Sequence, residues 1–228
     1  MLRYAGTMPS APPSASGRKA QAARNDAAIL EAARAVFVAD PGAPISAVAQ
    51  RAGVGISALY RRYASKDELL RKLCGDGLKA YIAAAEDALA DDRDAWKVFR
   101  AFMHRIVAAD TRSLTARLAG ALEDTSDALW RDAGKAQDLS ERVFERAQQA
   151  GAVREDAVVE DMANVFEQLT AIHGATEQRT AELRKRCLAL QLDGLRPRKK
   201  ARTLPGPPPK WNETFRSGKT WAGARRPH

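Results

Sequence analysis

The chain has 228 residues, of which 45% are hydrophobic and 29% are charged, a composition typical of a soluble globular protein. No apolar run approaches the length of a membrane span and the N-terminus lacks the apolar core of a secretion signal, so we expect a cytoplasmic protein without a membrane partner. In a reducing compartment the two cysteines, Cys74 and Cys187, are not expected to form a disulfide framework.

The formal net charge of +9 is unevenly distributed along the chain. Residues 196–228 hold ten Lys or Arg and one acid, which gives +9, whereas residues 1–195 hold 27 basic and 27 acidic residues and sum to zero. Within this neutral part, residues 1–24 and residues 51–72 each carry +4 and the remainder carries −8. A basic N-terminal region on an acidic body indicates an anionic partner, and nucleic acid is the leading candidate.

The first predicted element is a helix that follows an irregular N-terminal segment. Residues 1–23 are rich in Pro, Ser and Ala with little periodicity, and we expect a disordered arm there. From Asn25 the apolar residues follow one face of a helix, until Asp40-Pro41-Gly42 breaks the pattern. The apolar face consists of Ile29, Ala33, Val36 and Phe37.

The next stretch, residues 46–63, has the layout of a helix-turn-helix. Ser46 is expected to cap a first short helix, and Gly53 can take the left-handed conformation that the turn needs. A second short helix is expected to start near Gly55, with small residues that allow its N-terminal end to approach a DNA groove. The residues expected to face back onto the first helix are Val54, Leu59 and Tyr63.

A long helix is predicted after this motif. Ser65 and Glu68 have the spacing of a capping box, and apolar residues keep helical spacing to about Asp91. Gly75 and Gly77 lie inside this helix, where each costs about 1 kcal/mol relative to alanine. Either another helix packs closely against the two glycines or they form a soft point between two domains, and we favour close packing.

Five further apolar stripes have helical spacing, and no segment shows the alternation of paired strands. The fold class is therefore all-α with about nine helices. Residues 196–228 are expected to form a basic, Pro-rich, solvated tail, although Trp211, Phe215 and Trp221 suggest that part of it docks on the body. The five stripes cover about 96–106, 114–122, 129–147, 159–172 (capped by Asp156) and 180–192.

Residues 25–72 resemble the DNA-binding region of the TetR family of bacterial transcriptional regulators. This close match covers about a fifth of the chain. It implies an arm at 1–23, a three-helix helix-turn-helix domain at 24–70, a helical regulatory and dimerisation domain at 71–195, and the tail at 196–228. The matching positions are Ala33–Phe37, Gly42, Ser46, Ala52-Gly53-Val54, Leu59-Tyr60, Tyr63 and Ser65–Leu70.

The resemblance implies that the helix-turn-helix contacts DNA. Its phosphate contacts would come from Ser46, Tyr60 and Lys66, the last aided by the dipole of the long helix. The sequence departs from the family pattern at Gly55, which replaces the usual Ser or Thr cap, and at Ile56, which is apolar where the family is usually polar. Ile56 would either touch a thymine methyl group or pack inward. The full expected DNA-binding set is Ser46, Gly55, Ile56, Ser57, Ala58, Tyr60, Arg61, Arg62 and Lys66.

The resemblance also implies a ligand cavity and a dimer interface in the regulatory domain. Apolar walls with few polar points suit a small apolar effector. Neither a cofactor nor a metal is expected, because His104 and His173 lack recognisable ligand partners in the sequence. The expected cavity lining is Trp96, Phe99, Met103, Leu118, Leu122, Trp130, Phe144, Phe166 and His173. The expected dimer interface is Val159, Met162, Leu169, Leu183, Cys187 and Leu190.

These features predict a homodimeric, ligand-responsive repressor that leaves a palindromic DNA operator when a small apolar molecule binds. The alternative is a protein that binds nucleic acid without sequence preference through its basic arm and tail. A helical enzyme ranks last, because the sequence shows no nucleophile–base pair, no metal-ligand spacing and no phosphate-binding loop.

Overall fold

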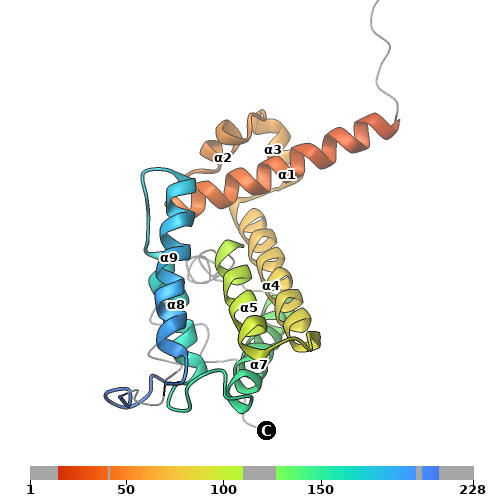
Figure 1. Ribbon diagram of the computed structural model, residues 1–228. Helices are drawn as coiled ribbons and strands as arrows, with labels where there is room; N and C mark the ends of the chain where they lie inside the picture. The colour runs from red at the N-terminus through yellow and green to blue at the C-terminus, as the bar shows by residue number, and fades with distance from the viewer. Residues whose placement is uncertain (1–14, 41, 110–126, 199–201, 211–228) are drawn as a thin grey trace, which may run out of the picture. The chain divides into compact units, whose positions relative to one another are not determined.

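The computed structural model describes residues 15–40, 42–109, 127–198 and 202–210, and every regular element in these ranges is a helix (Figure 1). The expected all-α fold is thus confirmed, while the helix expected at 114–122 lies outside the described residues. The chain divides into two compact units, Met1–Lys66 and Asp67–His228. The helices are α1 (Ala15–Ala39), α2 (Ile45–Ala52), α3 (Ile56–Arg62), α4 (Lys66–Ala90), α5 (Ala95–Ala108), α7 (Asp127–Gln149), α8 (Val159–Thr170) and α9 (Glu177–Leu195).

In the first unit, α1 starts well before the expected position. It begins at Ala15, so residues 15–23 are helical and the prediction of a disordered arm was wrong for them. The segment is rich in Ala, with Lys, Arg and Gln, which all favour helix without any need for a buried face. The residues at 19–24 are accordingly exposed.

The core of the first unit forms where α1 packs on α2 and α2 packs on α3. Phe37 from α1, Val48 from α2 and Leu59 from α3 are completely buried. Each such side chain contributes roughly 1.5–3 kcal/mol through its removal from water. This small core sets which face of α3 is turned inward.

The two ends of α2 compare differently with expectation. The turn after the helix is as predicted, and the cap before it is not. Gly53 has φ 65°, and Val54 N donates to Ala49 O at 3.1 Å, so the predicted left-handed turn is confirmed. The predicted cap at Ser46 was wrong, because α2 already begins at Ile45 and its N-cap is Pro44. The helix therefore starts two residues earlier than a cap at Ser46 would allow, and its first residue, Ile45, is buried in the core.

In the second unit, α5 packs on α7 and α9, and α8 packs on the same two helices. Together with α4 they enclose one apolar core. Gly75 of α4 comes close to α7, since a Cβ atom added there would lie 3.5 Å from Leu129 Cδ2, and Gly77 is buried. Both observations support the close-packing interpretation of the two glycines.

The last two helices also differ from expectation at their starts. Asp156 does not cap α8; instead Val158 N donates to Asp161 Oδ2 at 2.9 Å. α9 begins at Glu177 rather than near Thr180, because the Thr176 side chain accepts from Arg179 N at 3.1 Å and caps it.

Part of the C-terminal tail docks on the turn between α7 and α8. Arg154 Nη2 donates to Arg202 O at 2.7 Å, and Leu204 N donates to Asp156 Oδ2 at 2.8 Å. The Arg154 guanidinium and this amide hold the pKa of Asp156 at about 2, so its carboxylate stays charged. Residues 202–204 are therefore tied to the body, whereas Trp211, Phe215 and Trp221 lie outside the described residues.

Candidate nucleic-acid interface

The outer face of α3 presents a compact set of exposed side chains. Ile56 is 40% exposed and Tyr60 is 49% exposed, and Ser57 and Arg61 are exposed beside them. The inner face is closed by Leu59, and by Tyr63 directly after the helix, which is 2% exposed. The burial of these two side chains fixes the rotation of α3 and so determines which residues face outward.

A carboxylate on α1 holds the C-terminal end of α3. Arg62 Nε donates to Asp26 Oδ1 at 2.7 Å and Arg62 Nη2 donates to Oδ2 at 3.0 Å. The Tyr63 hydroxyl donates to the same Oδ1 at 2.8 Å. Asp26 was missed by sequence reasoning, because it precedes Arg62 by 36 positions and a single acid on a helix carries no periodic signal. The arrangement makes Arg62 part of the support of α3 in this structure.

Lys66 also points into the first unit. Its Nζ donates to Ala43 O at 2.8 Å and lies 5.0 Å from the centre of the Phe37 ring. A cation over an aromatic face is attracted by the ring quadrupole. In this structure Lys66 therefore joins the start of α4 to the loop before α2.

The structure thus separates the nine expected DNA contacts into three groups. Gly55, Ile56, Ser57, Tyr60 and Arg61 lie together, exposed, at the start and along the outer face of α3. Ser46 is exposed in the first turn of α2, and Ala58 is half-buried. Arg62 and Lys66 bind other groups of the protein.

In the second unit, much of the expected cavity lining is packed core. Phe99, Met103, Phe144 and Phe166 are buried, and the Phe99 and Phe144 rings meet edge to face with centres 6.1 Å apart. Trp96 and Trp130 are half-buried. His173 is exposed between α8 and α9, so it lines no buried cavity in this structure, and Leu118 and Leu122 lie outside the described residues.

A small pocket reaches Phe99. It is also lined by Ala88, Val98, Val143 and Arg146, and its volume of about 10 Å³ is space for about one water molecule. An effector would therefore have to open this region of the core before it could bind there.

A buried polar pair joins α4 to α7 in this core, and sequence reasoning missed it. The Tyr81 hydroxyl lies 2.7 Å from Ser140 Oγ, and Ser140 Oγ donates to Ala136 O at 2.7 Å. Because the Ser140 hydroxyl has one proton, Tyr81 is the donor of the pair. These groups are polar points within an otherwise apolar core.

The expected dimer residues fall on two different faces. Met162 is 1% exposed and Leu169 is 2% exposed within a single subunit, so both belong to its core and the prediction that they face a partner was wrong. Leu183 and Cys187 are half-buried, as is Val159, and Leu190 is 67% exposed. Leu183, Cys187 and Leu190 are four and three residues apart, which places them on one side of α9.

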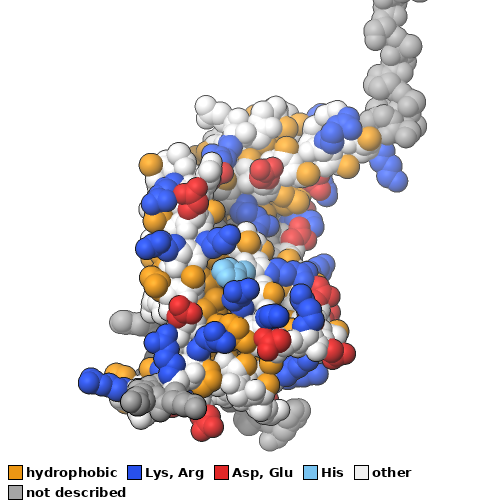
Figure 2. All heavy atoms as spheres, viewed as in Figure 1, with side chains coloured by type: hydrophobic (Ala, Val, Ile, Leu, Met, Phe, Trp, Pro, Cys, Tyr) orange, Lys and Arg blue, Asp and Glu red, His pale blue; other side chains and the backbone are white. Residues whose placement is uncertain are grey.

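The second unit also contains a cysteine and a histidine whose pKa values are shifted by their surroundings. Burial raises the pKa of the Cys74 thiol to about 12, so this thiol stays protonated. His104 is partly buried, and its pKa is lowered. The main cause is burial, and the positive charges of Arg100 and Lys185 add to it. Figure 2 shows Lys and Arg side chains around a histidine on the face of the molecule in view. Within the described residues, no group of three His, Cys, Asp or Glu side chains could hold a metal ion.

Comparisons with known proteins identify the family. The family model of bacterial regulatory proteins of the tetR family matches residues 29–73, and the model of the SbtR-like transcriptional regulator C-terminal domain matches residues 91–197. The chain belongs to the TetR family. It is accordingly a DNA-binding transcriptional regulator, and the helix-turn-helix identified above is the DNA-binding motif of that family.

Solved structures of TetR regulators have the same fold as this chain. A TetR transcription regulatory protein from Mycobacterium vanbaalenii is 27% identical, with a TM-score of 0.52 over 79% of this chain and 99% of that one. The regulator PfmR from Thermus thermophilus is 22% identical, with a TM-score of 0.54 over 74% of this chain and 99% of that one, and supports the fold alone. A search of curated proteins found no match. None of the described helices has the length and hydropathy needed to cross a lipid bilayer.

Proposed function

We propose that this TetR regulator is a homodimeric repressor that binds a palindromic operator through α3 and releases it when a small apolar molecule enters the second unit. The observation that carries the proposal is that α3 has one buried face and one exposed face. Its inner face is fixed by Leu59 and Tyr63, while Ile56, Ser57, Tyr60 and Arg61 are exposed on the other face. A helix held in this way can enter a major groove with its N-terminal end first.

The chemistry of the exposed face suits the reading of a duplex. Tyr60 and Ser46 can donate their hydroxyl protons to phosphate oxygens, which positions the protein. Arg61 and Ser57 are placed to hydrogen-bond to base edges, and Ile56 offers an apolar contact for a thymine methyl group. Gly55 and Ala58 leave room for the backbone to approach the bases. Arg62 and Lys66 would act chiefly by holding α3 and α4 in place.

The proposed dimer uses the outer side of α9. Leu183, Cys187 and Leu190 form a stripe there, and an exposed leucine such as Leu190 is best removed from water by a second subunit. Two-fold symmetry would present two copies of α3 to two half-sites, which is why the operator is proposed to be palindromic.

The proposed effector site lies in the apolar core of the second unit. The Phe99 and Phe144 rings and Met103 would supply apolar contacts, and the Tyr81–Ser140 pair would offer a polar anchor. Because this core is packed in the present structure, binding would require rearrangement, and a ligand that prefers the rearranged state shifts the population towards it.

The function is tested by selecting DNA from a randomised pool on the full-length protein at physiological salt. We expect a palindromic sequence to be enriched and to bind with an affinity at least a thousandfold above that for random DNA. Enrichment of no sequence would refute the operator-binding proposal. Adding small apolar molecules to the selected complex then tests release.

Ile56 provides a prediction about operator choice. Replacing it by alanine is expected to change the preferred sequence at one position of each half-site, because the thymine methyl contact is lost. The free energy of unfolding should stay within about 0.5 kcal/mol of the wild-type value, as at an exposed site. Repeated selection and a denaturant titration measure the two effects.

Leu204→Ala, at a leucine of similar exposure in the tail, is the control and should alter neither. A change in stability alone would place Ile56 in the core.

A second candidate function is sequence-independent binding through the basic tail, because residues 196–228 carry the whole net charge of the chain. Truncation after Lys210 tests it and leaves the contacts of Arg202 and Leu204 intact. The truncation removes four basic residues and one acid. We expect the slope of log affinity against log salt to fall by up to about 4 while the operator preference is kept. An equal and large loss of affinity for the operator and for random DNA would favour the second candidate.

A further inference from the structure

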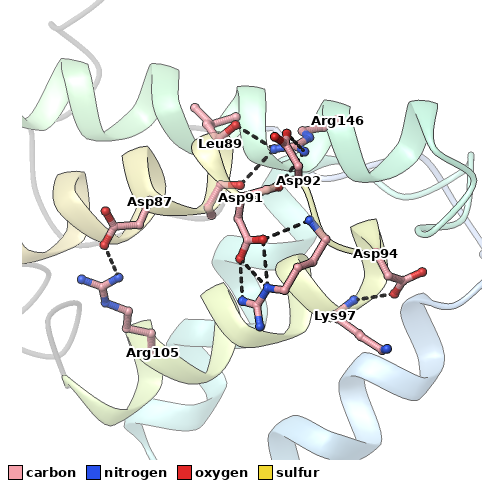
Figure 3. A network of polar contacts seen from close by, with 10 residues as sticks. Asp87, Leu89, Asp91, Asp92, Asp94, Lys97, Arg105 and Arg146 are labelled. Atoms are coloured by element: carbon pink, nitrogen blue, oxygen red, sulfur yellow. Dashed lines mark hydrogen bonds and ion pairs between the residues drawn. The ribbon is translucent and has the colours of Figure 1, made fainter.

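The C-terminal end of α4 is held by one side chain of α7. Arg146 Nη1 donates to Ala88 O at 3.0 Å and to Leu89 O at 2.8 Å, and Arg146 Nη2 donates to Asp91 O at 2.7 Å (Figure 3). The guanidinium also lies 3.9 Å from Asp92 Oδ1. One half-buried arginine therefore binds the carbonyls of three residues at the point where α4 ends.

This arrangement satisfies groups that a helix cannot satisfy by itself. The last four carbonyls of an α-helix have no partner within the helix. An arginine offers five donors in a rigid planar fork, so it can bind several of these carbonyls at once, whereas a lysine is a single charged point. Arg146 thus binds the backbone at residues 88–91, which are the end of α4 and the residue after it, to the side of α7.

Neighbouring ion pairs do not provide the same connection. Arg93 pairs with Asp91 within one loop, and Arg105 of α5 pairs with Asp87 of α4 through side chains that are both exposed. Lys135 of α7 pairs with Glu86 of α4, again between exposed side chains. Exposed pairs of this kind contribute little to stability, and they join side chains, whereas Arg146 binds backbone carbonyls.

The same arginine borders the apolar core where the effector is proposed to bind. Arg146 and Ala88 line the small pocket together with Phe99 and Val143. A molecule that enlarged this pocket would therefore displace residues that form the contact between α7 and the end of α4.

We propose that Arg146 is a positioning residue for operator binding, which fixes the C-terminal end of α4 as the pivot of that helix. The inference rests on the proposed function. α4 starts at Lys66, the last residue of the first unit, and has 25 residues. Its length is therefore about 36 Å, and a rotation of roughly 5° about the pivot would move its start by about 3 Å. A small change at residues 88–91 becomes a large one where α4 begins.

Arg146→Lys tests the proposal, since it keeps the charge and loses the fork. In the free protein we expect backbone amides in residues 84–92 to exchange with deuterium at least tenfold faster, with no change in residues 97–106 of α5. Affinity for the selected operator should fall about threefold to tenfold, and the salt slope should stay unchanged because no phosphate contact is lost. Arg146→Gln gives a second variant, and thermal melting identifies which of the two is folded at the assay temperature.

Arg184→Lys is the matched control. Arg184 of α9 donates to Ile172 O at 3.2 Å and to Thr170 O at 3.1 Å, so it binds the end of α8 with the same chemistry. This variant should leave exchange in residues 84–92 and operator affinity unchanged, with the dimer verified by sedimentation.

Unchanged exchange at 84–92 in Arg146→Lys, or an equal loss of affinity in Arg184→Lys, would overturn the inference. If the wild-type protein selects no operator, the proposed function fails, while the exchange measurement still decides whether Arg146 holds α4.

Discussion

Replacing Asp26 by alanine is expected to weaken operator binding at least tenfold and to lower the free energy of unfolding by about 1–3 kcal/mol. The carboxylate accepts hydrogen bonds from Arg62 and from the Tyr63 hydroxyl, and the Tyr63 side chain is 2% exposed. Its removal leaves a buried hydroxyl without this partner and releases the C-terminal end of α3. Gel shifts with the selected operator and denaturant titrations measure the two effects.

Two further variants separate the contributions within this network. Asp26→Asn keeps an oxygen that can accept from the Tyr63 hydroxyl and loses the ion pair with Arg62, so its effects should be smaller than those of alanine. Tyr63→Phe removes a single hydrogen bond and should have the smallest effect on operator affinity. A rise in operator affinity in Asp26→Ala would contradict this account, because it would mean that Asp26 withholds Arg62 from a phosphate.

Local pattern in the sequence predicts the helix-turn-helix well. Gly53 and Leu59 are recognisable because a tight turn demands a left-handed residue and a short helix must bury one face, and both demands act within a few residues. The outward direction of Tyr60 and Arg61 then follows from the same helical period, whereas the sequence left open whether Ile56 faces outward or packs inward. These features required no knowledge of how distant parts of the chain meet.

Contacts between polar groups far apart in the chain could not be predicted in this way. Asp26 meets Arg62, and Lys66 meets the carbonyl of Ala43, only once the helices have packed. Arg146 binds carbonyls, which every residue has, so no residue type in its partner segment signals the contact. Such contacts depend on tertiary structure and leave no periodic trace in the sequence.

The apolar arcs of α8 and α9 show a second limit. Met162, Leu169 and Leu190 are all apolar at helical spacing, and the sequence does not distinguish an apolar face covered by its own subunit from one covered by a partner. In the structure Met162 and Leu169 pack within the subunit while Leu190 is 67% exposed. Burial within one chain therefore narrows the proposed interface to the side of α9 that carries Leu183, Cys187 and Leu190.

Leu190→Asp is expected to have the largest effect on assembly. If Leu190 is buried between two subunits, an unpaired carboxylate in its place must lose its hydration in each of them. The dimer dissociation constant should rise at least a hundredfold, which corresponds to about 3 kcal/mol. Operator affinity should fall at least as much at protein concentrations below that constant, because each monomer would bind only one half-site. Sedimentation and gel shifts measure the two effects.

The matched control for Leu190→Asp is Ala189→Asp, which adds the same charge one residue earlier. Ala189 is also exposed, and adjacent residues lie about 100° apart around a helix, so this position points away from the stripe. It should leave assembly and operator affinity unchanged, and both variants should keep the wild-type melting behaviour at concentrations where the protein is monomeric. Equal effects at the two positions would mean that a negative charge anywhere on the exposed surface of α9 weakens assembly, whether or not it lies on the stripe. No effect at either would mean that this side of α9 stays in contact with water, and the dimer would then have to form through another surface.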